Sequence, residues 1–153
     1  MNIHTLFCDL PKGIHIAIVP YQREHTRTIP LFASTVPAGF PSPAEDYLDT
    51  CLDLNDLVVK HPAATFFVRA KGHSMIDAGI DSGDVLVVDR ALEPGETSIV
   101  VAILNGDFTV KRISHCDDGF YLLPANCNLD PIQITEDMDF QIWGVVTHVI
   151  HRL

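Results

Sequence analysis

The sequence has few basic residues. It carries ten Lys and Arg against twenty Asp and Glu, which gives a net charge of −10 with the histidines neutral. Proteins that bind nucleic acid neutralise its phosphates with clustered Lys and Arg, and no such cluster occurs in the sequence. We therefore expect no direct nucleic-acid binding, and the acidic surface favours solubility and basic protein partners.

Long apolar segments are missing too. The longest continuous apolar run, Ile99–Leu104, is far shorter than the roughly 20 residues that span a bilayer. Residues 1–13 include Asp9, Pro11 and Lys12 and lack the apolar segment of a signal peptide. We expect no membrane association and a cytoplasmic location.

Metal-binding patterns are also missing. The eight histidines show no H-E-x-x-H spacing; His148 and His151 could lie near each other, but two ring nitrogens make a poor site. The cysteines form no C-x-x-C pair and are expected to be reduced. They are Cys8, Cys51, Cys116 and Cys127. We expect no metal and no other cofactor.

The rest of the composition predicts one folded, β-rich domain. Of the 153 residues, 47% are hydrophobic, enough for a single core. After residue 64, short apolar runs alternate with turn signals, which is typical of a mostly antiparallel β domain. Asn105-Gly106 is the strongest hairpin signal, and Pro94-Gly95 and Asp117–Gly119 are further turns. The predicted strands are Thr65–Ala70, Val85–Arg90, Ser98–Leu104, Phe108–Ser114, Phe120–Pro124, Ile132–Thr135 and Phe140–His151.

Helical patterns occur only within residues 44–62. A first short helix is predicted over Ala44–Cys51. A second begins after Asp53, a good N-cap residue, and is stopped by Pro62. The apolar residues of the second helix fall at helical spacing, at Leu54, Leu57 and Val58.

Residues 1–38 cannot close a core alone. They contain one strand-like run, Ile14–Val19, and are too short and too rich in proline breaks for a helix-turn-helix domain. This segment is either a disordered extension or an arm that packs on its own body or on a second subunit. The following Pro-Ala-Gly-Phe-Pro-Ser-Pro, residues 37–43, is expected to be extended because proline restricts itself and the residue before it.

One turn presents a candidate nucleophile. Ser74 lies in the glycine-punctuated segment Lys71–Asp84, between two predicted strands. A serine hydroxyl needs a base that removes its proton. His73 is adjacent in sequence and points to the other face of an extended chain, so Lys111 is the better candidate. The alternatives are an ordinary turn serine and a lysine on a solvent-facing strand surface.

Three segments together resemble the LexA-type self-cleaving Ser-Lys peptidases, and among them the UmuD-type SOS mutagenesis proteins. Lys71–Asp84 resembles their nucleophile region, Phe108–Arg112 their general-base region, and Val36–Pro43 their cleavage segment with an Ala38–Gly39 bond. The resemblance covers about residues 31–151. It departs from UmuD relatives at His73, where Asp is usual, and from LexA in lacking a DNA-binding domain.

The resemblance implies a compact LexA/UmuD-like β-rich catalytic domain with one or two short helices and an extended N-terminal arm. Ser74 would be the nucleophile, Lys111 the base, and Ala38 and Gly39 the residues of the cleaved bond. Cleavage would separate an arm, residues 1–38, from a peptidase domain, residues 39–153.

The resemblance also implies partners. They are the RecA–single-stranded DNA filament as stimulator, a second copy of the chain in a homodimer, and a UmuC-like Y-family DNA polymerase that carries out error-prone translesion synthesis in the SOS response to DNA damage. The alternatives are a LexA-like repressor fragment and a non-catalytic polymerase-binding module.

A lysine base sets a condition on the site. With an ordinary pKa of about 10.4, lysine is charged at neutral pH. Its pKa must be lowered by roughly 2–3 pH units, about 3–4 kcal/mol, by desolvation. We expect Met75, Val110 and Ile113 to supply the apolar surroundings.

Overall fold

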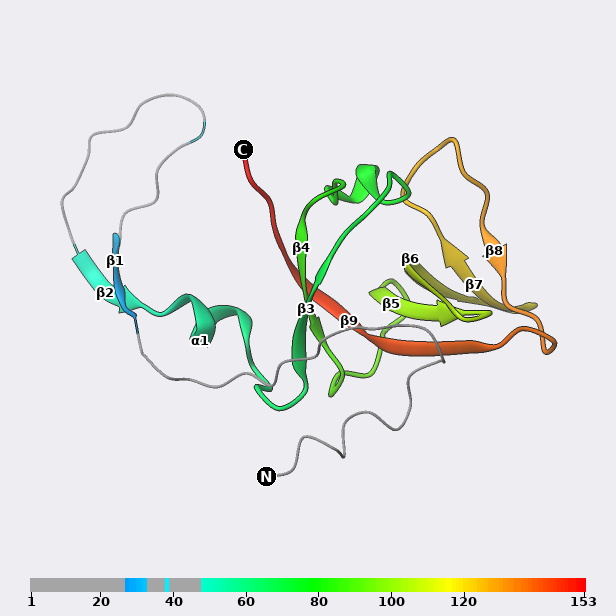
Figure 1. The fold of residues 1–153 in the computed structure, drawn as a ribbon, viewed down its shortest axis with the longest axis horizontal. Helices are drawn as coiled ribbons and strands as arrows, with labels where there is room; N and C mark the ends of the chain where they lie inside the picture. Colours follow the sequence, from blue (N-terminus) through cyan, green and yellow to red (C-terminus); the bar gives the residue numbers. More distant parts are fainter. Residues whose placement is uncertain (1–26, 33–37, 39–47) are drawn as a thin grey trace.

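The computed structural model describes residues 27–32, 38 and 48–153. Within these residues the protein is mainly β, as predicted: a seven-stranded antiparallel sheet has the order β3-β4-β9-β5-β6-β7-β8, and β1 and β2 form a separate two-stranded sheet (Figure 1). The strands are β1 Ile29–Phe32, β2 Leu48–Leu52, β3 Thr65–Arg69, β4 Val85–Asp89, β5 Ile99–Leu104, β6 Asp107–Cys116, β7 Gly119–Leu123, β8 Ile132–Gln133 and β9 Phe140–Ile150. The helical elements are α1, Leu54–Val58, and the 3-10 turn η2, Ile76–Ala78.

The long strand β9 joins the two halves of the large sheet. Its first half pairs with β5 and its second half with β4, and Val145 lies opposite both Val100 and Asp89. Figure 1 shows β9 running along the whole sheet. Gly144 permits this arrangement, because a Cβ there would lie 2.7 Å from Val88 Cγ1 and 3.1 Å from the Asp89 carbonyl oxygen.

Two core clusters lie on opposite faces of β5, as alternation along a strand requires. The first core cluster contains Phe66, Met75, Ile80, Leu86, Val88, Val101, Ile103 and Trp143. The second core cluster contains Val100, Ala102, Ile113, Leu122 and Val145. In the first, Trp143 packs edge-on against Phe66 of β3 and Phe108 of β6, with ring centroids 4.6 and 4.9 Å apart, so it links strands that are not neighbours in the sheet.

The strand and turn predictions are confirmed from β3 onward, with ends that differ by one or two residues. Asn105 and Gly106 both have positive φ, at 50° and 89°, and they join β5 to β6 as a two-residue hairpin. Asp117 and Asp118 make the next hairpin turn, between the paired Cys116 and Gly119.

The helix predicted over Ala44–Cys51 is wrong for the described part of that range. Leu48–Leu52 is strand β2, which pairs with β1 from Ile29 opposite Leu52. Pairing with a segment some 20 positions earlier outweighed the local helical pattern, which contains no information about a distant partner strand. Residues 44–47 lie outside the described residues, as does the predicted Ile14–Val19 strand.

The second predicted helix exists as α1 and is shorter than expected. Asp53 caps it as predicted, with Oδ1 accepting from the Asn55 backbone N–H at 2.9 Å. The helix ends at Val58, before Pro62. Leu54 and Leu57 remain exposed, at 57% and 45%, so the predicted apolar face of α1 does not contribute to the core.

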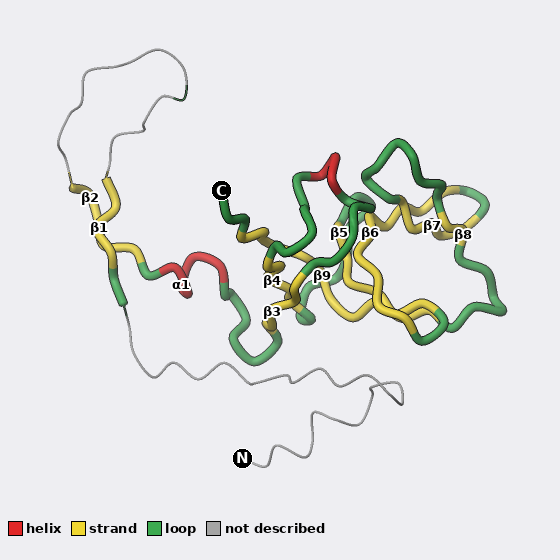
Figure 2. The backbone as a smooth tube through the Cα atoms, turned by 45° about the horizontal axis from the view of Figure 1, so that its top comes forward, coloured by secondary structure: helices red, strands yellow, loops and turns green. Residues whose placement is uncertain are grey.

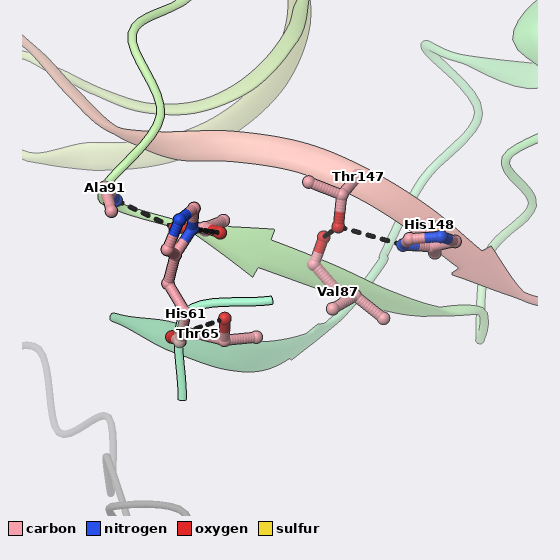
Figure 3. Close-up of polar contacts among 7 residues, drawn as sticks. His61, Thr65, Val87, Ala91, Thr147 and His148 are labelled. Carbon is pink, nitrogen blue, oxygen red and sulfur yellow. Dashed lines mark hydrogen bonds and ion pairs between the residues drawn. The ribbon is translucent and has the colours of Figure 1, made fainter. Parts of the chain in front are cut away.

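Polar contacts fasten the chain before β3 to the end of β4. The buried carboxylate of Asp89 accepts from the Ala91 N–H at 2.8 Å, and its Oδ2 lies 2.6 Å from His61 Nδ1. Figure 3 shows His61 and Ala91 together at this end of β4, with Thr147 of β9 reaching the Val87 carbonyl further along the strand.

A similar contact fastens the chain after β9 to the start of β4. Buried Asp84 accepts from the Asp81 N–H at 2.8 Å, and its Oδ1 lies 2.7 Å from His151 Nδ1. The bond from Asp81, assisted by His151, lowers the pKa of the Asp84 carboxyl against the opposing effect of burial. The β3–β4 hairpin is therefore held at both ends, and it is this hairpin that carries Ser74.

Candidate active site

Ser74 lies in the connection between β3 and β4, close to where the two strands separate. Ala70 N–H donates to the Asp84 carbonyl at 2.8 Å, and Gly83 N–H donates to the Ala70 carbonyl at 2.9 Å, so the base of this connection is closed by paired backbone bonds. Met75 and Ile80, each 3% exposed, anchor the loop in the first core cluster. Ser74, next to the buried Met75, is thus attached to a fixed part of the loop.

Lys111 lies on β6 and reaches across to this loop. Its Nζ is 2.9 Å from Ser74 Oγ, 2.8 Å from Thr109 Oγ1 and 3.1 Å from the Val110 carbonyl oxygen. A protonated lysine has three N–H donors, and these three acceptors match them. A neutral amine would keep two donors, for Thr109 and Val110, and offer its lone pair to the Ser74 hydroxyl.

The pair lines a cavity of about 290 Å³ whose walls contain both apolar and polar side chains. Desolvation by burial lowers the pKa of Lys111 below its ordinary 10.5. The lining residues are Val68, Arg69, Ala70, Lys71, Gly72, Ser74, Met75, Ile80, Val101, Phe108, Thr109, Val110 and Lys111. The neutral amine, the form that a base must have, is therefore easier to populate than in an exposed lysine.

One of the three expected apolar neighbours is wrong. Met75 and Val110 line the cavity with Lys111, as expected. Ile113 instead packs in the second core cluster with Val100 and Leu122. The cavity's further apolar lining includes Phe108 and Val101, whose proximity depends on the pairing of β5 with β6.

The other residues named from the sequence are His73, Ala38 and Gly39. The side chain of His73 is exposed, and its backbone carbonyl accepts a hydrogen bond from Asn126 Nδ2 at 2.7 Å. Ala38 is exposed in a bend, whereas Gly39 lies outside the described residues. The roles of Ser74 and Lys111, and cleavage between Ala38 and Gly39, stay predictions.

Two residues at the site were missed in the sequence. Thr109 lies two positions before Lys111 on β6, and alternation along a strand places both side chains on one face, a signal that could have identified Thr109 as a partner of the amine. Asn126 lies in the loop after β7 and contacts the β3–β4 connection, residues 70–84, which we call the nucleophile loop. No local pattern indicates that contact.

One group of possible metal ligands occurs among the described residues. Ligand atoms of Asp81, Asp84 and His151 all lie within 4.8 Å of one another. Asp84 already accepts from the Asp81 backbone and contacts His151, so these bonds account for the arrangement.

The cysteines Cys51, Cys116 and Cys127 are exposed free thiols. No helix in the described part of the chain is long and apolar enough to cross a membrane.

The chain is similar to a known protein family and to several named proteins over most of its length. The family model described as Peptidase S24-like matches residues 30–147, a range that includes Ser74 and Lys111. Protein ImpA of Escherichia coli is 48% identical over 129 residues, which cover 80% of this chain and 83% of ImpA. Protein SamA of Salmonella typhimurium is 47% identical over 137 residues, covering 90% and 95%. Protein MucA of Escherichia coli is 44% identical over 126 residues, covering 79% and 83%.

Proposed function

Because the chain belongs to the Peptidase S24-like family, we propose that it is a self-cleaving serine peptidase of the UmuD type, with Ser74 as nucleophile and Lys111 as general base. The observation that carries this proposal is the 2.9 Å contact between Lys111 Nζ and Ser74 Oγ, in a cavity where Lys111 is partly desolvated. Nucleophile and base within hydrogen-bond reach are the minimum geometry for covalent catalysis by serine.

The reaction proceeds in two stages. Neutral Lys111 takes the proton of Ser74, Oγ attacks the carbonyl carbon of Ala38, and the resulting oxyanion is stabilised by backbone N–H groups, foremost that of Ser74. The Ala38–Gly39 bond then breaks, and the new amine of Gly39 takes the proton from Lys111. Water, deprotonated by Lys111, attacks the ester. Lys111 then returns that proton to the Ser74 oxygen as it leaves, and the acid formed on Ala38 ionises in water to a carboxylate.

Such a chain needs control. A cleavable segment tethered to its own site has an effective concentration of order 10⁵ M or more when well oriented, so the cleavable arrangement must be populated rarely. A partner that binds this arrangement increases its population. In this proposal that partner is the RecA filament on single-stranded DNA.

In this proposal the cleaved protein has a function of its own. Cleavage removes residues 1–38 and leaves residues 39–153 as a homodimeric subunit that engages a UmuC-like Y-family polymerase in SOS mutagenesis. The net charge of −10 favours a role through protein partners over direct contact with DNA. We infer that the protein works in the cytoplasm and without a cofactor.

The test is intact-mass spectrometry of the purified chain after incubation with RecA, single-stranded DNA and nucleotide. We expect two products, residues 1–38 and 39–153, from the wild type and none from Ser74→Ala. Cleavage that persists in Ser74→Ala, or that maps to another bond, would exclude this assignment.

A further inference from the structure

The loop after β7 is bonded to the nucleophile loop at three points. Asp77 N–H donates to the Ala125 carbonyl at 2.8 Å, Cys127 N–H donates to Asp77 Oδ2 at 3.2 Å, and Asn126 Nδ2 donates to the His73 carbonyl at 2.7 Å. Figures 1 and 2 both show η2 and this loop at the same end of the sheet. Two segments about 50 positions apart thus form one unit next to Ser74.

Within this unit the amide of Asn126 is fixed at both of its polar atoms. Its Oδ1 accepts from the Asn128 N–H at 2.9 Å, which forms a local turn of the kind Asn favours. Its Nδ2 donates to the His73 carbonyl. Because the turn orients the amide, the donor is held in place before it meets the nucleophile loop.

The bonded carbonyl belongs to the peptide unit that joins His73 to Ser74. This unit is planar, and in the trans form its C=O and N–H point in opposite directions. Fixing the His73 oxygen therefore also fixes the direction of the Ser74 N–H. A hydrogen bond to the carbonyl additionally polarises the unit and makes its N–H a stronger donor.

We propose that Asn126 is a positioning residue that holds the His73–Ser74 peptide so that the Ser74 N–H faces the developing oxyanion. This inference rests on the proposed function, in which that N–H is the foremost oxyanion donor. Asn126 acts through the peptide unit and takes no part in proton transfer. Donors of this kind are effective only when they are oriented before the reaction begins.

The experiment compares three variants of the full chain with wild type. Asn126→Asp keeps the Oδ1 acceptor for the turn and loses the donor to His73. Asn126→Ser keeps a turn-compatible hydroxyl, is uncharged, and is too short to replace the amide. Asn128→Ala is the matched control, because Asn128 contributes only its backbone N–H to the turn.

Two rates are measured for each protein below its melting temperature: covalent labelling of Ser74 by a fluorophosphonate probe, and self-cleavage as a function of pH. We expect both rates to fall about 10- to 100-fold in Asn126→Asp and Asn126→Ser, less than or similar to the loss of a direct oxyanion donor. Asn128→Ala should match wild type. The pH midpoint of Asn126→Ser should not move, because the surroundings of Lys111 are unchanged.

Wild-type rates in either Asn126 variant would overturn the positioning role. So would an upward shift of the pH midpoint in Asn126→Ser, because it would mean that the site has loosened and Lys111 has become hydrated. The labelling rates separate this inference from the proposed function. If wild-type Ser74 is labelled but the Ala38–Gly39 bond stays intact, the proposed function fails. The labelling rates of the Asn126 variants then still decide the role of Asn126. If Asn126→Asp does not fold, Asn126→Ser gives the decision.

Discussion

At the scale of single residues, Lys111 is subject to two opposing effects. Desolvation disfavours its charged form, while acceptors at Ser74, Thr109 and Val110 favour it. Desolvation is the stronger effect, because the pKa of Lys111 is lowered. The cavity therefore provides a base that is neutral at lower pH than an exposed lysine, and Thr109 also orients its amine.

Replacing Thr109 with valine tests this balance. Valine has nearly the same shape but accepts no hydrogen bond, so the ammonium form loses one favourable contact. We expect the pKa of Lys111 to fall further, which shifts the pH midpoint of self-cleavage downward. The plateau rate should decrease about tenfold, because the amine is oriented less well. An unchanged midpoint, measured from the pH–rate profile, would contradict the role of Thr109, and Thr109→Ser serves as the conservative control.

Some contacts of the site residues could be predicted from the sequence and others could not, for a physical reason. The contact between Thr109 and Lys111 follows from local spacing, because residues two apart on a strand share a face, and the predicted Asn105-Gly106 hairpin is present between β5 and β6. The expectation that Ile113 is a neighbour of the Lys111 amine was wrong, because the neighbours of a side chain depend on which strands pack against its face. Asn126 was missed because its contact with His73 arises only once β7 has been placed in the sheet.

At the scale of elements, the fold depends on how closely β9 approaches β4. Strand existence could be read from local patterns, because apolar runs and turn residues lie next to each other in the chain. The identity of β2 could not, since it is determined by its pairing with β1. The central place of β9 and the close contact at Gly144 also depend on distant partners and left no local signal.

Gly144→Ala tests this close approach. The added methyl group would lie 2.7 Å from Val88 Cγ1 and 3.1 Å from the Asp89 carbonyl oxygen, so the Val88 side chain or the neighbouring backbone must shift. We expect a loss of about 1–3 kcal/mol in the free energy of unfolding, typical of overpacking, measured by urea denaturation. Gly95→Ala is the matched control, because its Cβ would meet Ser98 Oγ at an ordinary 3.7 Å. Equal stability of the two variants would contradict a tight β4–β9 contact.

At the scale of the whole molecule, the proposed cleavage separates two paired strands. β1 precedes the Ala38–Gly39 bond and β2 follows it, and the two form a sheet of their own. The seven-stranded sheet and both core clusters lie entirely after the bond. Cleavage would therefore release β1 and expose an edge of β2 without removing any part of the main core.

We accordingly expect residues 39–153, expressed alone, to fold and to pair with a second copy. The melting temperature should lie within about 5 °C of that of Ser74→Ala full-length protein, which corresponds to a stability change of roughly 1 kcal/mol in a domain of this size. An exposed strand edge is a ready template for pairing with another chain, so the fragment should bind a Y-family polymerase differently from the uncleaved protein. Calorimetry measures the melting temperature, sedimentation measures pairing with a second copy, and a pull-down measures polymerase binding. An unfolded or monomeric fragment would contradict this expectation, and so would unchanged polymerase binding.

The central claim is that neutral Lys111 activates Ser74, and the pH dependence of self-cleavage without RecA tests it most directly. The deprotonated fraction of Lys111 is small below its pKa and complete above it. The first-order rate constant should therefore rise about tenfold per pH unit and level off at a pH below the ordinary lysine pKa of 10.5. Lys111→Arg should be inactive at every pH, because arginine keeps its proton. A rate that is independent of pH between about 7 and 10, or cleavage by Lys111→Arg at the wild-type rate, would contradict the account.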